Sequence, residues 1–315
     1  MLRRAALRAI GLASLAALAQ ARAVRAMAAL EEHPLAGTIW DLNTERRSTV
    51  ETLLAALRAA RFRLLGEVHD NPDHHAARLK LLDALGESGL KPAVAFEQFD
   101  RAYDGALQQR LAGGDATAED VAGAVQFDRK GWNWDWYRPL VEAALRHRMP
   151  LRAANLSRAE AGRVAKEGMA ALGAAQISRL RLETVWSGEK ERLLREIIYE
   201  GHCRSLPERL VPNMTAAQRA RDATLAEALL DPPADGAVLI AGNGHVRRDL
   251  GVPLYLRQGS PDARVVSLGL LEVESGKDRA ANYLAARAER AYDFAWFTPR
   301  ARREDPCKAL RSPQK

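Results

Sequence analysis

Side chains that can bind a metal ion or transfer protons are concentrated in residues 64–75. This stretch, LLGEVHDNPDHH, holds Glu67, two aspartates and three of the seven histidines. Residues 61–66 have the apolar character of a short buried strand, and a helix is expected to start directly after the acidic segment. Asn71 is a preferred N-cap residue, and Pro72 suits the first position of a helix because its missing N–H would be unpaired there anyway.

The two adjacent histidines His74 and His75 lie in the first turn of this expected helix, over residues 72–87. The helical period places His75 on the stripe that faces the sheet and His74 about a quarter-turn away, on the flank of the helix. The positive end of the helix dipole disfavours imidazolium there. Neutral imidazole is the form that binds a metal ion or accepts a proton.

Four further strands are predicted from apolar runs, and the segments between them have helical patterns. The expected strands are 61–66, 91–99, 149–156, 236–241 and 264–273, with a short edge strand at 38–41. Helices are expected at 48–60, 72–87, 102–112 and 118–125, and another follows the aromatic segment 131–139 and ends at about residue 147. Four more are expected within 158–230, and the last of these opens at a capping box, 215–218. Beyond residue 275 we expect a helix, an aromatic knot at 292–297 and a basic, disordered end.

Strands that alternate with helices and are apolar on both faces predict an α/β fold with a mostly parallel central sheet covered by helices. Ligands of such sheets bind outside the carboxyl ends of the strands. Polar residues follow four of the predicted strands and are therefore expected to converge at one edge: Glu67 with His69, Glu97 with Gln98, Asn155, and Asn243 with His245.

Glu67, His69, Glu97 and His245 together could form a nitrogen-and-oxygen metal site or a general acid/base set. Burial at a strand end would raise the pKa of Glu97 and suit it to activate water. The structural alternative is that Glu97 accepts hydrogen bonds from loop N–H groups, and that His245 is a hydrogen-bonded turn residue. The glycines on either side of His245 fit either close approach of the backbone to a ligand or a tight turn.

The strongest aromatic cluster is GWNWDWYRP at 131–139. Trp132, Trp134 and Trp136 are spaced two apart, which suits a loop or strand with a flat surface. Such clusters usually form core or lid packing. A planar macrocycle or a sugar could also stack on such a cluster.

Composition is ordinary for a globular α/β protein, with 315 residues, 47% hydrophobic and 28% charged. The formal charge is +7, but the arginines are spread along helices and are not interleaved with aromatics in one block. We therefore expect an anionic small molecule and no nucleic acid as the partner.

The first residues resemble a secretory signal, with a basic Met1–Arg4 segment, an alanine- and leucine-rich stretch and small-residue cleavage sites. The apolar run is too short for a stable membrane span, and no cysteine near the cleavage region could carry a lipid. The expected organisation is a signal peptide at 1–28, one α/β domain at 36–300 with a helical insertion at 158–230, and a tail at 301–315. Cys203 and Cys307 either pair or remain free thiols.

Five motifs together resemble the ChaN family of bacterial haem-binding uptake proteins, within the superfamily of Tiki proteases and erythromycin esterases. In order they are GEVHDNPDHH at 66–75, AFEQF at 95–99, the aromatic element at 132–139, the segment from Gln218 to Asp222, and AGNGHVRRDLGVP at 241–253. The resemblance implies a shared pocket at Glu67, His69, Glu97 and His245. It also implies haem contacts from His74, His75, Tyr103, Trp132, Trp134, Tyr137 and Asn243. ChaN haem ligation is associated with tyrosine and a dimer, which makes Tyr103 and Tyr137 the candidate ligands.

Three hypotheses follow. The first is a periplasmic haem-binding protein of iron acquisition, exported and not lipid-anchored, with haem as cofactor and a possible homodimer. The second is a hydrolase that uses a divalent metal ion or a Glu/His pair on the four pocket residues. The third is a binding module with solvated strand ends.

Overall fold

The computed structural model describes residues 32–283, 290–305 and 307–308. Its core is an eight-stranded sheet in the order β2-β1-β8-β7-β3-β6-β4-β5. All pairs among the six strands from β8 to β5 are parallel, and β1 and β2 form an antiparallel extension. The predicted α/β fold with a mostly parallel sheet is confirmed. The expected signal peptide and much of the expected helix beyond residue 275 lie outside the described residues.

Each predicted core strand is present, and two strands were not predicted as such. The strands are β1 (Ile39–Asp41), β2 (Arg46–Ser48), β3 (Phe62–Leu65), β4 (Ala93–Asp100), β5 (Leu151–Asn155), β6 (Ala237–Ile240), β7 (Val265–Glu272) and β8 (Phe294–Thr298). The expected aromatic knot is in fact strand β8, which pairs with β7. The expected edge strand β1 lies one position inside the edge, because β2 covers it.

The α-helices also follow the predicted pattern, including four between residues 158 and 230, except that α11 was not predicted. They are α2 (Val50–Arg58), α3 (Pro72–Glu87), α4 (Asp104–Leu111), α5 (Ala118–Ala124), α6 (Trp134–Arg146), α7 (Arg158–Glu167), α8 (Ala174–Arg179), α9 (Gly188–Gly201), α10 (Val211–Leu229) and α11 (Val252–Gly259). None of the described helices is both long and apolar enough to cross a bilayer.

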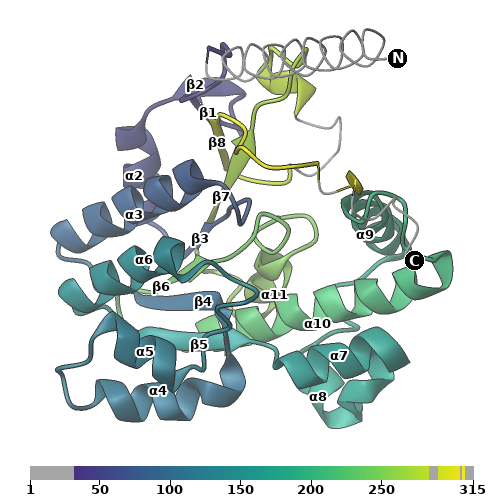
Figure 1. Cartoon of the computed structure of the whole chain (residues 1–315), viewed down its shortest axis with the longest axis horizontal. Helices are drawn as coiled ribbons and strands as arrows, with labels where there is room; N and C mark the ends of the chain where they lie inside the picture. Colours follow the sequence, from purple (N-terminus) through teal and green to yellow (C-terminus); the bar gives the residue numbers. More distant parts are fainter. Residues whose placement is uncertain (1–31, 284–289, 306, 309–315) are drawn as a thin grey trace, which may run out of the picture.

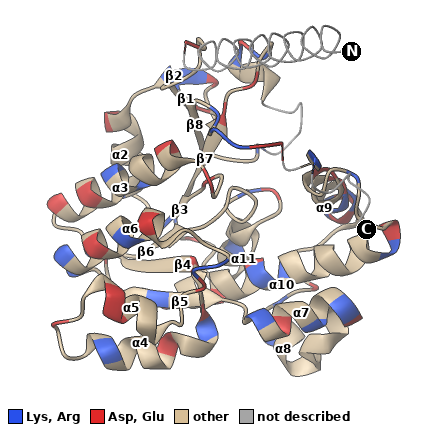
Figure 2. Cartoon of the chain, in the orientation of Figure 1, with Lys and Arg blue, Asp and Glu red and all other residues tan. Residues whose placement is uncertain are grey.

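Helices cover both faces of the sheet (Figure 1), because successive residues of each central strand point to opposite sides. In β3, Leu64 belongs to the cluster that packs against α7, α10 and α11, whereas Leu65 belongs to the cluster against α2, α3 and α6. Both leucines are fully buried. Charged side chains of both signs are distributed over the covering helices (Figure 2).

The turn between β3 and α3 has the predicted geometry. Asn71 is the N-cap of α3, its side chain accepts hydrogen bonds from the N–H groups of Asp73 and His74, and Pro72 opens the helix. The Asn71 amide group also donates to the carbonyl of Pro299 at 3.0 Å. This double use of Asn71 fixes where strand β3 ends and therefore where the polar residues after it lie.

Two local predictions were wrong. The expected capping box at Thr215 lies inside α10, where the Thr215 hydroxyl donates to the carbonyl of Val211 at 2.8 Å. The tryptophan-rich segment does not form a flat loop or strand, because Asn133 caps α6 and places Trp134 and Trp136 in its first turn.

The two cysteines form a disulfide, which settles the alternatives left open by the sequence. Cys203 follows α9 and Cys307 lies beyond β8, with an S–S distance of 2.02 Å. The bond ties the segment after the last strand to the helical insertion. In the same segment, Arg303 forms an ion pair with Glu272 at the end of β7.

Candidate functional site

Glu67 and His245 follow strands β3 and β6, Glu97 lies in the last part of the neighbouring strand β4, and the three meet at one edge of the sheet. The Nε2 atom of His245 lies 3.2 Å from the carboxylate of Glu97, and the carbonyl of Glu67 accepts from the N–H of Asn243 at 2.8 Å. The side chain of Asn155, at the end of β5, donates to the carbonyl of Glu97 at 2.7 Å. The structure therefore brings together the polar strand ends that the sequence singles out.

The Glu67 carboxylate is buried at the centre of a hydrogen-bond network. It pairs with the guanidinium of Arg78, accepts from the Tyr137 hydroxyl at 2.7 Å, and lies 2.6 Å from Nδ1 of His69. Burial raises the pKa of Glu67, but Arg78 and the two nearby histidines lower it more, so the net pKa is below the usual value. Glu67 is thus held as a carboxylate, which orients the His69 ring.

His69 is the member of the site that faces outward. Its side chain is 43% exposed, and its Nε2 atom has no hydrogen-bond partner among the described residues. Burial of part of the ring lowers its pKa, but the hydrogen bond to Glu67 and the charge of Glu97 raise it above the usual value overall. A β-carbon on Gly242 would lie 2.8 Å from the His69 ring, so a larger residue there would displace the ring.

His74 and His75 both point inward, so the expected placement of His74 on the flank of α3 was wrong. Nδ1 of His74 accepts from the N–H of Val68 at 2.8 Å, and its Nε2 lies 2.8 Å from the Thr298 hydroxyl. Nδ1 of His75 accepts from Arg78 at 2.7 Å, and its Nε2 lies 2.9 Å from the His69 carbonyl.

Burial lowers the pKa of His74 to about 3 and that of His75 to about 4. Both rings are therefore neutral at pH 7. Their four nitrogens are all used inside the protein, where they hold the loop between β3 and α3 in place.

His245 lies between two buried carboxylates. Its Nδ1 is 2.6 Å from Asp222, and its Nε2 faces Glu97. Burial lowers the pKa of His245, but Glu97 and Asp222 raise it, to about 10 overall. For Glu97 the raising effect of burial is outweighed by His245, so its pKa is well below the usual value, whereas burial dominates at Asp222 and raises its pKa to about 6.

The pKa of Glu97 in this group of Glu97, His245 and Asp222 differs from the sequence-based expectation. We expected burial to raise its pKa and make it a water-activating base. Glu97 instead faces an imidazolium and also accepts a hydrogen bond from the N–H of Gly242 at 2.7 Å, which is the structural alternative named above. A strongly ionised carboxylate is a weak base.

The aromatic residues divide into one at the site and several in the core. Trp132 is half-buried and contacts the His69 ring edge-on, with 4.7 Å between ring centroids. Trp134 is buried and donates to Glu119 at 2.6 Å, and Tyr137 is only 1% exposed. Burial beside Glu67 raises the pKa of Tyr137 far above its usual value. Trp132 is therefore the tryptophan best placed to contact a ligand.

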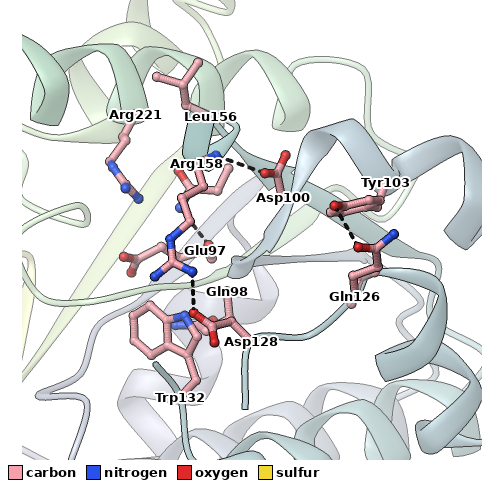
Figure 3. Close-up of a pocket in the computed structure, with 12 residues that line it drawn as sticks. Glu97, Gln98, Asp100, Tyr103, Gln126, Asp128, Trp132, Leu156, Arg158 and Arg221 are labelled. Atoms are coloured by element: carbon pink, nitrogen blue, oxygen red, sulfur yellow. Dashed lines mark hydrogen bonds and ion pairs between the residues drawn. The ribbon is translucent and has the colours of Figure 1, made fainter. Parts of the chain in front are cut away.

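A pocket of about 260 Å³ opens beside this network at the carboxyl edge of the sheet (Figure 3). Tyr103 and Trp132 contribute aromatic surface, and the Tyr103 hydroxyl donates to Gln126 at 3.0 Å. Arg158 and Arg221 supply positive charge. The full lining is Glu97, Gln98, Asp100, Tyr103, Val125, Gln126, Asp128, Trp132, Asn155, Leu156, Arg158 and Arg221.

A divalent metal ion finds no support in this geometry. No group of three or more His, Cys, Asp or Glu side chains in the part of the chain that the structure describes is arranged to hold a metal ion. The reason is visible in the pairing: the Glu67 carboxylate is used by Arg78 and Tyr137, and Glu97 is used by His245 and a backbone N–H.

The sequence of a known family matches this region. The model of the family described as "Haem-binding uptake, Tiki superfamily, ChaN" covers residues 53–256. The chain belongs to the ChaN family. The matched region runs from α2 to α11 and contains all four predicted pocket residues, Glu67, His69, Glu97 and His245.

A solved ChaN structure shares the fold. The ChaN protein of Campylobacter jejuni, whose structure concerns cofacial haem binding, is 21% identical, with a TM-score of 0.65 over 82% of this chain and 95% of that chain. An erythromycin esterase, EreC, in its open conformation is 13% identical over 71% of this chain and 73% of that chain, with a TM-score of 0.39. No curated protein matches the sequence.

Sequence reasoning gave no role to two residues that position the site of this ChaN-family chain, although Asp222 belongs to the motif from Gln218 to Asp222. Arg78 carries the buried charge opposite Glu67, and the helical spacing of four from His74 could have placed it on the same face. Asp222 holds His245, and Gln218, four residues earlier on α10, lies 3.1 Å from the same ring nitrogen. That spacing of four was the available signal.

Asn243, which was expected to contact the ligand, is used within the sheet. Its side chain bridges to β7, donating to the carbonyl of Leu270 at 2.6 Å and accepting from the N–H of the same residue at 3.1 Å. This pair of bonds copies one rung of a β-ladder and fixes the loop that carries His245.

Proposed function

We propose that this protein binds haem at the carboxyl-edge pocket and serves haem or iron acquisition in the periplasm. The observation that carries the proposal is the combination of ChaN membership with a pocket lined by Trp132, Tyr103 and two arginines. An aromatic ring beside cationic side chains suits a planar, anionic macrocycle.

Among the tyrosines considered, Tyr103 is the one that would hold the haem iron. Tyr103 lines the pocket, and among the described residues its hydroxyl bonds only to the exposed Gln126. The Tyr137 hydroxyl instead lies in the core against a carboxylate, where ionisation to a phenolate is opposed. His69, with Nε2 unpartnered and Nδ1 held by Glu67, is the competing ligand, because ligating histidines usually donate their other N–H to such a group.

The size of the pocket bears on the oligomeric state. Pockets that enclose a ligand usually measure about 300–1,000 Å³, and this one measures about 260 Å³. Most of the macrocycle would therefore lie outside the pocket. We propose that a second copy of the chain covers it, and a molecular-mass measurement in solution with and without haem tests this dimer.

The disulfide supports the proposed compartment. Disulfides persist in oxidising environments such as the periplasm and are rare in the cytosol. The bond between Cys203 and Cys307 joins segments 104 residues apart in the sequence. Fractionation of the native cell, with non-reducing gels of the recovered protein, tests both the location and the bond.

Titration of the purified protein with haem tests the proposed function. The proposal expects a saturable Soret shift at micromolar haem, and absence of that shift would overturn it. Tyr103→Phe is expected to change the ferric spectrum, because the phenolate ligand is lost. If His69→Gln changes the spectrum and Tyr103→Phe does not, the ligand is His69 instead.

A hydrolase is the second candidate, favoured by the His69–Glu67 pair. An exposed imidazole whose other nitrogen faces a buried carboxylate is the arrangement of a general base. In this hydrolase, His69 would take a proton from the attacking water, and no metal ion would be needed. It predicts hydrolysis of small esters or amides that His69→Gln abolishes, whereas turnover equal in wild type and variant would exclude the role.

A further inference from the structure

Arg221 is a cationic side chain of the pocket whose role the proposed function leaves open. It lies on α10, directly before Asp222, and is half-buried. In Figure 3 its guanidinium points toward the space between Glu97 and Arg158. It forms no hydrogen bond or ion pair with any of the described residues.

The acidic side chains that line the pocket already accept hydrogen bonds or form ion pairs within the protein. Glu97 is used by His245 and Gly242, as described above. Asp100 accepts from the N–H groups of Ala102 and Arg158 at 2.9 and 3.0 Å. Asp128 pairs with the Arg158 guanidinium at 2.7 Å. Among the described residues that line the pocket, Arg221 is the cationic side chain that has no hydrogen-bond or ion-pair partner.

Two other side chains that line the pocket, Asn155 and Gln98, present hydrogen-bond acceptors. The Asn155 amide group donates to the Glu97 carbonyl, which fixes its oxygen as the free acceptor. The Gln98 amide group donates to the Tyr137 hydroxyl at 3.3 Å and so leaves its oxygen free as well. Both oxygens are buried and lack hydrogen-bond partners among the described residues. Acceptor oxygens cannot bind a carboxylate, so a negative group in this pocket needs the guanidinium of Arg221.

We propose that Arg221 binds a carboxylate of the ligand and thereby fixes its orientation in the pocket. The inference rests on the proposed function, and for haem the carboxylate is a propionate. A guanidinium can hold both oxygens of a carboxylate in a planar fork. A pocket of about 260 Å³ is large enough for a side arm of that kind, and Trp132 would contact the macrocycle.

Haem and its dimethyl ester separate this role from general binding. Arg221→Gln is expected to weaken haem binding by about ten- to a hundredfold, the effect of one charge-assisted contact. It should leave binding of the ester nearly unchanged, and Arg221→Lys should retain part of the affinity. Arg163→Gln removes the same charge from an exposed position of α7 and serves as the matched control. Equal losses for haem and ester, or no loss, would overturn the inference while leaving haem binding intact.

A second experiment tests the inference even if the wild type does not bind haem. Absence of haem binding would overturn the proposed function but not the role of Arg221. Phenylglyoxal modifies accessible arginines, and peptide mass spectrometry reads the extent at Arg221. Glutarate is expected to protect Arg221 more than the uncharged glutaramide, with no difference at Arg163. Equal modification of Arg221 in the two solutions would show that the pocket does not recognise a carboxylate.

Discussion

The guanidinium of Arg78 and the carboxylate of Glu67 form an ion pair in which neither side chain is exposed to solvent. Arg78 comes from α3 and Glu67 follows β3, so the pair joins the helix to the strand end that carries His69. The position of His69 therefore depends on a charge buried behind it.

Arg78→Met is expected to destabilise the protein strongly. Removing one partner leaves the other charge buried and unpaired, which costs about 3–5 kcal/mol. Urea unfolding of the variant measures the loss. Arg163→Met, on the exposed face of α7, is the control and should change stability by less than about 0.5 kcal/mol.

The double variant Glu67→Gln/Arg78→Met identifies the cause. It leaves no unpaired charge and should be more stable than Arg78→Met alone. If the double variant is as unstable as the sum of the single changes, the loss comes from packing and not from the buried charge.

Loss of the disulfide is expected to lower stability by about 2–5 kcal/mol, the usual range for a native bond that closes a long loop. The loop here spans 104 residues between Cys203 and Cys307. Denaturant unfolding with and without reductant measures the effect. The Cys203→Ser/Cys307→Ser variant should have the same unfolding midpoint as the reduced protein. An unfolding midpoint of the wild type that does not change when reductant is added would contradict the prediction.

The stability of the protein should fall as the pH decreases from about 6.5 toward 5. Burial lowers the pKa of His74 to about 3 and of His75 to about 4, so the unfolded chain takes up protons that the folded chain does not. Their contribution is fully present above pH 6.5 and is lost as the pH falls toward these values. The raised pKa values of Asp222, about 6, of His245, about 10, and of His69 act in the opposite direction, His245 and His69 mainly near pH 6.5 and Asp222 down to pH 5.

His75→Gln isolates one of these protons. It should reduce the pH slope of the unfolding free energy by about 1.4 kcal/mol per pH unit relative to the wild type, the effect of one proton. Urea midpoints at pH 6.5, 6.0, 5.5 and 5.0, taken with the urea dependence of the unfolding free energy, give the two slopes. Parallel slopes would show that His75 is not held neutral by burial.

Local signals account for much of what the sequence predicted. The cap formed by Asn71 and Pro72 and the apolar runs of the core strands need no knowledge of distant residues. Because the strands are parallel, the rule about their carboxyl ends then places Glu67, Glu97 and His245 together.

The parts that sequence analysis missed depend on partners far apart in the chain. The burial of His74 on α3 follows from its contact with Thr298 on β8. The low pKa of Glu97 follows from His245, 148 positions later, which is itself charged because Asp222 lies on its other side. Thr215 matches a capping pattern, but the helix already begins at Val211.

The central claim is that the ligand lies against Trp132 at the carboxyl edge of the sheet. The most direct measurement compares the haem dissociation constants of Trp132→Ala and Trp40→Ala. Trp40→Ala is the control because it removes the same indole from β1, near the opposite edge of the sheet. The account predicts at least about a tenfold weaker affinity for Trp132→Ala, in line with the loss of an aromatic contact, and no change for Trp40→Ala. Equal affinities of the two variants for haem would contradict it.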